Sequence, residues 1–347
     1  MGMFGIGSPI TTARADEPQG TGTGTAAHPS SPIPVQGPPL GQAVRTMLGE
    51  TGLSVFPLIM GGGEFGWHVD PAASHSILDA YRERGGNAVH TSDSYSAGRS
   101  AHIIGQWMHA RGIRDEIVVG VRVGSSPEHP GLGAVNLVRA VEGALTRLRT
   151  DRIDVLYLDA SLDAGTNLED TLATVEWLRE AGKISAVGAF RFAPERLVEA
   201  RILAAAGYPR LEVLDEPYNL VRRDGFEGDL RLVAAAQSLA VTPSHALEHG
   251  FLSGRHRSKA AAVGVRGQQM RNHLNRRGIR VLRALDLIAE ELAVPVAAVS
   301  MAWLLAQRTI VAPIVNAFAL EHVDELMQGA GITLSRTQVA ELTRASE

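Results

Sequence analysis

The chain has 347 residues, a formal net charge of −4 and no cysteine, which excludes disulfides, thiolate metal sites and a cysteine nucleophile. No apolar run reaches the roughly 18 residues of a membrane span, and no basic field indicates nucleic acid or anionic lipid. Only Lys183 and Lys259 are lysine, so arginine carries almost all of the positive charge. We therefore expect a cytoplasmic protein that acts on a small molecule, with neither a nucleic acid nor a membrane as partner.

The first 45 residues are rich in Gly, Pro, Ser and Thr and show no sustained apolar pattern. This composition predicts a disordered leader, because such a segment cannot bury enough apolar surface to fold. The leader lacks the basic start and the long apolar core of a secretory signal. We therefore expect a disordered leader over residues 1–45 and a folded domain over residues 46–347.

From residue 46 onward, strand-like apolar runs alternate with segments of helical spacing. Strands are predicted at 55–60, 88–90, 116–123, 153–159, 184–190, 211–215, 240–244 and 310–315. Helices are predicted at 71–84, 101–111, 136–149, 167–181, 194–206, 230–239, 277–292, 300–307 and 320–328. This order is typical of a parallel sheet, and eight strand–helix units predict an α/β fold closed into a (β/α)8 TIM barrel.

An open doubly wound sheet is the competing fold, but no Gly-x-Gly-x-x-Gly follows the first strand. In a parallel barrel the chemistry lies in the loops at the carboxyl ends of the strands. The stretch 87–95, Asn-Ala-Val-His-Thr-Ser-Asp-Ser-Tyr, is a short buried strand that runs into such a loop. We expect His90 and Tyr95 both to face a pocket there.

Several motifs follow one another in a characteristic order over residues 46–344. Residues 48–61 look like a hairpin and first strand, 87–95 like N-x-x-D-T-A-x-x-Y, and 98–105 like G-x-S-E-x-x-I-G. Further matches are a strand lead-in at 152–155, G-K-I-R-x-I-G at 182–188, Y-N-L at 218–220, G-x-L-T-G at 250–254 and A-L-A-W at 302–305. Together they resemble the aldo-keto reductase superfamily, which implies a barrel that opens with an N-terminal hairpin.

The resemblance also implies a catalytic set of Asp, Tyr, Lys and His, in which the tyrosine protonates a carbonyl while NADPH supplies hydride. At these places the chain has His90, Tyr95, Arg122 and Asp159, so only the tyrosine is retained. We expect Tyr95 to be the acid, His90 the base, Asp159 the orienting group and Arg122 a fixed positive charge. A His90–Asp159 pair would raise the pKa of the imidazole. Alternatively, Asp159 pairs with Arg122 alone and is structural.

The positions that hold the nucleotide in this superfamily are also replaced. The Ser-Asn pair falls on Phe190 and Arg191, the Gln on Asp215, and the stacking aromatic on Ser244. At the last strand the phosphate-binding glycine becomes Asn316, followed by Phe318, Ala319, His322 and Leu326. Losing that glycine and the nearby cation removes the main anchors for a dinucleotide. We expect no resident cofactor, or at most weak NADP binding, in a groove that Phe190 and Phe318 partly block.

Other polar residues are candidates for substrate binding at the rim of the barrel. These candidates are Glu64, Trp67, His68, Asp93, Arg191, Asp215 and His245. His245, His249 and His256 suggest a metal site, but they lack a helical i, i+4 frame, and we expect them to be solvated or to line the pocket. Ordinary rim residues remain the alternative interpretation for Glu64, Trp67 and His68.

Three functions are compatible with this site. The first is cofactor-independent proton transfer, such as dehydration, isomerisation or cyclisation of a small polar metabolite in bacterial specialised metabolism. The second is a divergent NADP-dependent carbonyl reductase. The third is a non-catalytic binding or regulatory subunit that keeps the barrel and has lost the chemistry. We favour the first, because four polar ionisable groups occupy the four catalytic places.

Overall fold

The computed structural model describes residues 44–259 and 264–347. The predicted leader, 1–45, lies outside the described residues except for its last two positions. The described chain opens with a two-stranded antiparallel hairpin, in which β1 (Thr46–Met47) pairs with β2 (Ser54–Val55). The hairpin agrees with the motif resemblance over residues 48–61.

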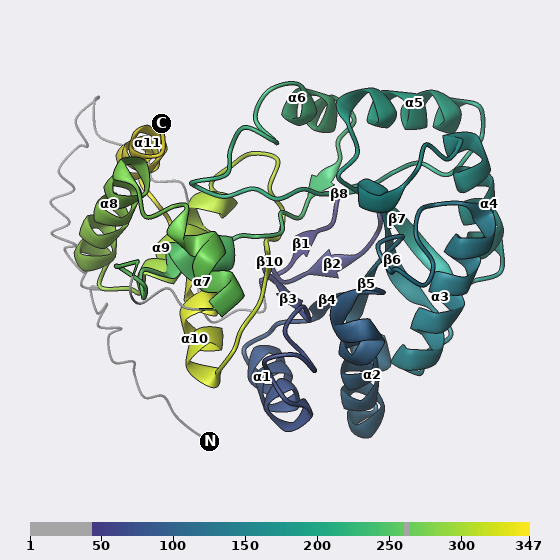
Figure 1. Ribbon diagram of the computed structural model, residues 1–347, viewed down its shortest axis with the longest axis horizontal. Coiled ribbons are helices and arrows are strands. Elements are labelled where there is room, and N and C mark those ends of the chain that lie inside the picture. Colours follow the sequence, from purple (N-terminus) through teal and green to yellow (C-terminus); the bar gives the residue numbers. More distant parts are fainter. Residues whose placement is uncertain (1–43, 260–263) are drawn as a thin grey trace, which may run out of the picture. The chain divides into compact units, whose positions relative to one another are not determined.

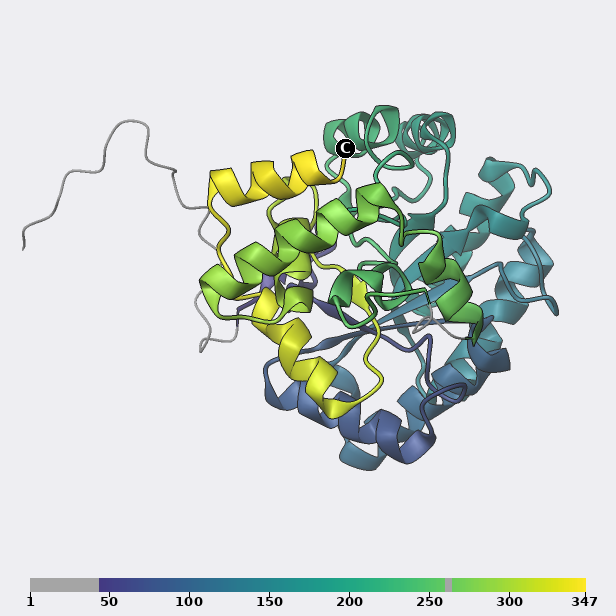
Figure 2. The same cartoon turned by 60° about the vertical axis from the view of Figure 1, so that its left-hand side comes forward.

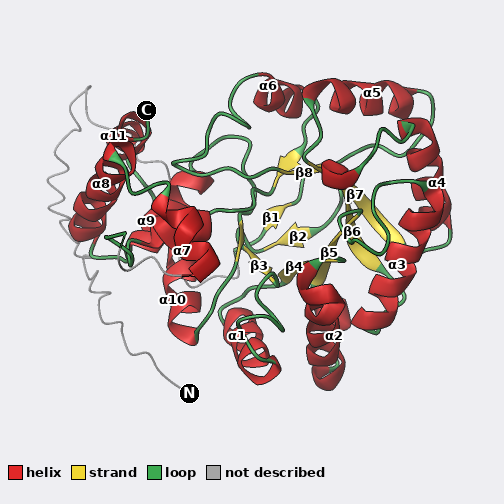
Figure 3. Ribbon diagram, viewed as in Figure 1, coloured by secondary structure: helices red, strands yellow, loops and turns green. Residues whose placement is uncertain are grey.

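Eight parallel strands form the sheet that the strand–helix alternation predicts (Figures 1 and 3). They are β3 (Ile59–Gly61), β4 (Ala88–Ser92), β5 (Val118–Val123), β6 (Ile153–Asp159), β7 (Ile184–Phe190), β8 (Val213–Asp215), β9 (Ala240–Val241) and β10 (Ile314–Val315). Their order is β10-β3-β4-β5-β6-β7-β8-β9. Val241 also bridges Ile310, with the amide of Val311 donating to the carbonyl of Val241 at 2.9 Å. This last bridge joins the two edges, so the sheet curls into a (β/α)8 barrel.

Helices follow the strands and cover the outside of the sheet (Figure 1). They are α1 (Pro71–Glu83), α2 (Arg99–Arg111), α3 (Ala134–Leu148), α4 (Leu168–Glu180), α5 (Pro194–Ala205), α6 (Asp229–Ala236), α7 (Gly264–Arg271), α8 (Arg276–Leu292), α9 (Val296–Leu305), α10 (Leu320–Gly329) and α11 (Arg336–Ala345). Short 3-10 turns are η1 (Tyr95–Gly98), η2 (Arg114–Glu116), η3 (Ala160–Leu162) and η4 (Glu248–Ser253). The C-terminal helix α11 lies along α8, as the turned view shows (Figure 2).

Three differences from the predicted elements have local causes. The predicted strand 55–60 is divided between β2 and β3, because Pro57 has no N–H to continue a ladder. The predicted helix 300–307 begins earlier, at Val296, since α9 is buried all round and shows no polar face to mark its start. Helices α7 and α11 were not predicted, although a capping box between Ser335 and Gln338 marks the start of α11.

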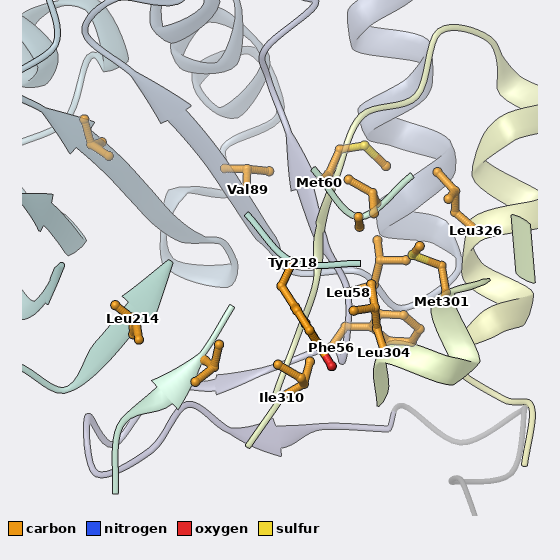
Figure 4. Packing of buried hydrophobic residues seen from close by; sticks show 14 of the residues in the cluster. Phe56, Leu58, Met60, Val89, Leu214, Tyr218, Met301, Leu304, Ile310 and Leu326 are labelled. Atoms are coloured by element: carbon orange, nitrogen blue, oxygen red, sulfur yellow. The ribbon is translucent and has the colours of Figure 1, made fainter. Parts of the chain in front are cut away.

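Two apolar clusters hold the barrel together. The larger lies between the sheet and the helices, and Figure 4 shows part of it, where Leu58 and Met60 pack with Met301, Leu304 and Leu326. The smaller fills the barrel interior with residues of β3, β6, β8 and β9, and it includes residues of the N-terminal hairpin. The hairpin therefore closes the amino-terminal end of the barrel and leaves the carboxyl ends of the strands for a site.

Among the described residues no single helix has the length and apolar character of a membrane span. Within the described part of the chain, only α8 and α9 taken together are long and apolar enough, and they are bent by 99° at the break between them. Both helices bury apolar residues in the core.

Candidate functional site

A cavity of about 680 Å³ opens at the carboxyl ends of the strands. Its volume lies within the range of roughly 300–1,000 Å³ that is usual for small-molecule sites. It runs from the loops after β4–β7 to the loops after β9 and β10 and to α7 and α10. Its polar and charged lining residues are Glu64, Ser94, Tyr95, Arg122, Ser125, Asp159, Ser161, Arg191, Ser244, His245, Glu248, His249, Ser253, Arg255, His256, Asn316, His322 and Glu325.

The cavity brings together only part of the predicted site. The candidates that line it are Glu64, Tyr95, Arg122, Asp159, Arg191 and His245. The candidates that do not line it are Trp67, His68, His90, Asp93 and Asp215. The three histidines that had suggested a metal site, His245, His249 and His256, all line the cavity. No group of three or more His, Asp or Glu side chains within 44–259 and 264–347 is arranged to hold a metal ion.

Tyr95 begins the turn η1 directly after β4. The two residues that follow it, Ser96 and Ala97, have φ values of 51° and 53°, and this left-handed backbone turns the chain sharply into α2. Burial raises the pKa of Tyr95, and Asp215 and Asp159 raise it further, although the charge and hydrogen bond of Arg122 act against them. The phenol is therefore protonated at neutral pH and is suited to donate a proton.

Arg122 on β5 lies between the phenol and two carboxylates. Its Nε atom is 3.2 Å from Oδ2 of Asp159, and its Nη1 atom is 3.9 Å from Oδ2 of Asp215. Its guanidinium also lies 5.3 Å from the centre of the Tyr95 ring and 4.1 Å from that of Phe190. Burial alone would lower the pKa of Arg122, but the neighbouring phenol and carboxylates outweigh it, so the cation persists.

The expected His90–Asp159 pair does not form. His90 on β4 is 1% exposed, and neither of its ring nitrogens has a hydrogen-bond partner within residues 44–259 and 264–347. Burial lowers the pKa of His90 to about 3, and the charge of Arg122 contributes, which is opposite to the expected rise. Its ring instead packs edge-on against Tyr95 and Tyr157, with ring centres 6.0 and 5.4 Å apart. The prediction that His90 faces the pocket was wrong, because its side chain lies deeper in the barrel than the cavity.

Asp159 bonds to its own loop and to Arg122. Its Oδ1 atom accepts a hydrogen bond of 2.8 Å from the amide of Ser161, and its Oδ2 atom faces Arg122. This arrangement matches the alternative in which Asp159 pairs with the cation. The carboxylate that holds the cation thus comes from β6 and not from β4.

Asp215 at the end of β8 is fully buried, and its Oδ1 atom accepts a hydrogen bond of 3.1 Å from the amide of Ser244. Its Oδ2 atom lies 3.9 Å from Arg122 and has no hydrogen-bond partner among the residues that the structure describes. Burial raises the pKa of Asp215 to about 6, although Arg122 opposes the shift. Its predicted role in direct substrate contact is not supported, because Asp215 does not line the cavity.

We expect Asp215→Asn to stabilise the protein above pH 6. The folded-state pKa of Asp215, about 6, exceeds the roughly 3.9 of an unfolded chain, so wild-type stability falls as pH rises through that window. The amide removes this loss and keeps the acceptor for the amide of Ser244. Urea unfolding should give the variant an advantage of about 3 kcal/mol at pH 8 and almost none at pH 4. A variant that is less stable than wild type at pH 8 would contradict this reading of Asp215.

The remaining predicted candidates lie in the loops at the carboxyl ends of the strands, where they contact one another or neighbouring loops. Asp93 accepts hydrogen bonds from the amide of Gly124 at 2.9 Å and from the hydroxyl of Ser125 at 3.3 Å, which ties the loop after β4 to the loop after β5. His68 lies 2.9 Å from Glu64 and accepts a hydrogen bond from the indole of Trp67. Trp67 is exposed. Of these residues only Glu64 reaches the cavity.

Glu248 in η4 is a lining residue that sequence reasoning did not identify. Its buried carboxylate accepts hydrogen bonds from Arg222 at 2.6 and 2.9 Å, from Asn219 at 2.7 Å and from His273 at 3.1 Å. Burial alone would raise the pKa of Glu248, but these donors hold it well below its usual range. The cluster fixes the loop after β9, where His245, Glu248 and His249 all have left-handed φ values. Glu248 lies between His245 and the motif at 250–254, so it could have been examined as a site residue.

The cavity continues past the two phenylalanines that were expected to block it. Phe190 and Phe318 both line it, and it extends to Leu326 on α10. At that end Arg255 pairs with both carboxylate oxygens of Glu325 at 2.7 Å through a single nitrogen, Nη2. The Ser244 hydroxyl is buried next to the carboxyl of Asp215, and Ser244 lines the cavity. The groove thus offers polar groups and space to a second molecule.

Comparisons with known proteins agree on one family. The profile of the Aldo/keto reductase family matches residues 57–347. The norsolorinic acid reductase stcV of Emericella nidulans is 28% identical, over 91% of this chain and 84% of its own. The aldo-keto reductase ausK of the same fungus is 29% identical, over 85% and 79%. The aryl-alcohol dehydrogenase (NADP⁺) of Phanerodontia chrysosporium is 26% identical, over 83% and 82%. These relatives carry oxidoreductase names, which favours redox chemistry over the lyase or isomerase chemistry expected from the sequence.

Proposed function

Because the chain belongs to the aldo/keto reductase family, we propose that it is a divergent oxidoreductase that reduces the carbonyl group of a small organic substrate. The observation that carries this proposal is the position of Arg122 between Tyr95 and Asp159. A phenol beside a cation, with a carboxylate behind the cation, is the arrangement that protonates a carbonyl oxygen. The family's lysine and aspartate are replaced, yet Arg122 and Asp159 supply the same two charges.

Each residue of this end of the cavity has a distinct role. Tyr95 donates its phenolic proton to the carbonyl oxygen as negative charge develops there. The fixed charge of Arg122 stabilises the phenolate that is left behind. Asp159 positions the guanidinium, and the buried Asp215 supplies a second, weaker contact on the same side of Arg122. His90 lies beneath the site as a neutral packing group.

We propose that a nicotinamide dinucleotide binds at the other end of the cavity, where Ser244, Arg255 and Phe318 line it. Such a nucleotide would supply the hydride. Ser244 contributes a hydroxyl in the cavity wall beside Asp215. Arg255 engages Glu325 through one nitrogen only, which leaves other N–H groups for a phosphate. Phe318 offers an exposed aromatic face. The family's phosphate-binding glycine is absent, so we propose weaker binding than is usual in the family.

The relatives narrow the substrate class for this proposal. Their names refer to aryl alcohols and to norsolorinic acid, so aromatic aldehydes and ketones are the first compounds to test.

The test is transfer of deuterium from C4-deuterated NADPH or NADH to a panel of aromatic aldehydes, read by mass spectrometry of the alcohols. Nucleotide binding is measured separately by fluorescence titration. We expect deuterated alcohol and a dissociation constant in the micromolar range or above. If neither nucleotide binds at millimolar concentration and no deuterium is transferred, the oxidoreductase proposal is refuted. Cofactor-independent acid/base chemistry would then be the remaining hypothesis for an enzyme.

A further inference from the structure

Arg191 is the residue that follows β7, and its position is unusual. Its φ is 55°, a left-handed backbone that costs free energy for a residue with a side chain. The side chain is exposed, lines the cavity and lies over Phe190, with the guanidinium carbon 5.3 Å from the ring centre. Arg122 covers the same ring at 4.1 Å. The aromatic ring thus holds a second guanidinium at the edge of the site.

Arg191 differs from the other arginines that line the cavity because it has no carboxylate paired with it in the described part of the chain. Arg122 has Asp159, and Arg255 has Glu325. Within the described part of the chain, Arg191 forms no ion pair. The half-buried carboxyl of Glu216 is influenced by the charge of Arg191, but burial and Asp215 raise the pKa of Glu216 to about 7, which weakens it as a counter-ion. The guanidinium is therefore available for an anion from outside the chain.

A hydroxyl lines the same rim of the cavity as this guanidinium. Asp159 and Phe190 are opposite each other in the register of β6 and β7, so the residues that follow them emerge side by side at the rim. One of these is Ser161, which lines the cavity and whose hydroxyl makes no hydrogen bond within the described residues. A planar guanidinium with a neighbouring hydroxyl matches a carboxylate, which accepts two parallel N–H bonds and a further O–H bond.

We propose that Arg191 and Ser161 bind a carboxylate of the substrate, so that the preferred substrates are carbonyl compounds that also carry a carboxylate. The inference rests on the proposed reductase function and deepens it. The carboxylate is held at the rim of β6 and β7, and the carbonyl reaches Tyr95 at the end of β4. Arg191 is a specificity residue in this arrangement and takes no part in proton transfer.

The test compares 4-formylbenzoate with its neutral methyl ester as substrates of the full-length protein. We expect kcat/KM to favour the carboxylate, and Arg191→Asn to lower that value about 10- to 100-fold, mostly through KM, while the ester is unchanged. Asparagine is chosen because it tolerates left-handed backbone and keeps the fold. Arg191→Lys should restore only part of the preference, since an ammonium cannot form the two parallel bonds. Arg201→Asn, on the exposed part of α5 and outside the cavity lining, is the matched control.

A binding measurement separates this inference from the reductase proposal. Calorimetric titration with 4-(hydroxymethyl)benzoate and with its methyl ester needs no turnover. Selective binding of the carboxylate that Arg191→Asn abolishes supports the inference even if no reduction occurs. Equal affinities for the two compounds, or equal kcat/KM values, overturn it. So does a variant that loses NADPH affinity but keeps the preference for charge, since Arg191 would then serve the nucleotide.

Discussion

Tyr95→Phe should reduce the rate of carbonyl reduction by about 10²- to 10⁴-fold, because proton donation by a positioned group contributes that much. The ring remains, so packing against His90 and the stacking of Arg122 are retained. Nucleotide and substrate affinity should therefore change little. Single-turnover kinetics with NADPH isolates the chemical step, and the loss should appear in kcat.

Tyr157→Phe is the matched control for this loss. Tyr157 lies next to His90 in the barrel but does not line the cavity, and its hydroxyl contacts Thr242 at 3.3 Å. Its removal should leave the rate within a factor of about 3, since one long and buried hydrogen bond is lost. If both variants are slowed equally, the phenol of Tyr95 has no special role. If Tyr95→Phe is as fast as wild type, proton donation comes from another group.

Arg122→Met should both destabilise the protein and abolish its activity. The change leaves Asp159 and Asp215 in a buried site without their cation, and breaking a buried pair in this way costs about 3–5 kcal/mol. Urea unfolding at pH 7 measures the cost. Replacing both carboxylates by asparagine in the same chain should recover most of the stability but none of the activity, because the phenolate would still lack its counter-charge.

The pH dependence of this variant has a definite sign. Arg122 lowers the pKa of the buried Asp215, so without Arg122 that carboxyl has a still higher pKa and the folded state binds its proton more tightly than the unfolded chain does. The loss of stability should therefore be largest above pH 7 and should shrink towards pH 4. Arg114→Met serves as control, since it breaks an ion pair of 2.9 Å with Asp154, remote from the cavity. Arg114→Met should lower stability but leave kcat per folded molecule unchanged. If kcat falls as much in Arg114→Met as in Arg122→Met, the loss of activity reflects unfolding and not the missing charge of Arg122.

Much of the fold could be predicted from the sequence because each unit carries its own local signal. The strands 153–159 and 184–190 were predicted with the bounds that the structure shows, since both are apolar runs closed by turn residues. The start of α9 was predicted too late. This helix is buried on all sides by its tertiary contacts, so its sequence shows no alternation of apolar and polar residues at helical spacing. The prediction of a strand over 55–60 also failed at its start. Val55 belongs to the hairpin strand β2, and Pro57 separates it from the barrel strand β3.

The sequence indicated which residues lie near the rim of the barrel, but it did not decide whether Asp159 pairs with His90 or with Arg122. Strand order placed Arg122 and Asp159 at one rim of the barrel. Which carboxylate receives the guanidinium depends on the register of β5 against β6 and on the depth of each side chain. His90 lies in the barrel below the cavity, so the expected His90–Asp159 pair does not form and Asp159 instead pairs with Arg122. Sequence patterns carry no measure of that depth.

The support of Arg122 from β6 and β8 constrains how this site can have evolved. A single change of His90 to aspartate would add a third carboxylate near one guanidinium that already serves two. A change of Arg122 to lysine would replace a fork that spans Asp159 and Asp215 by a point charge. Each single step towards the family's usual set should therefore be unfavourable alone, so we expect substitutions at His90 and Arg122 to be tolerated better together than singly.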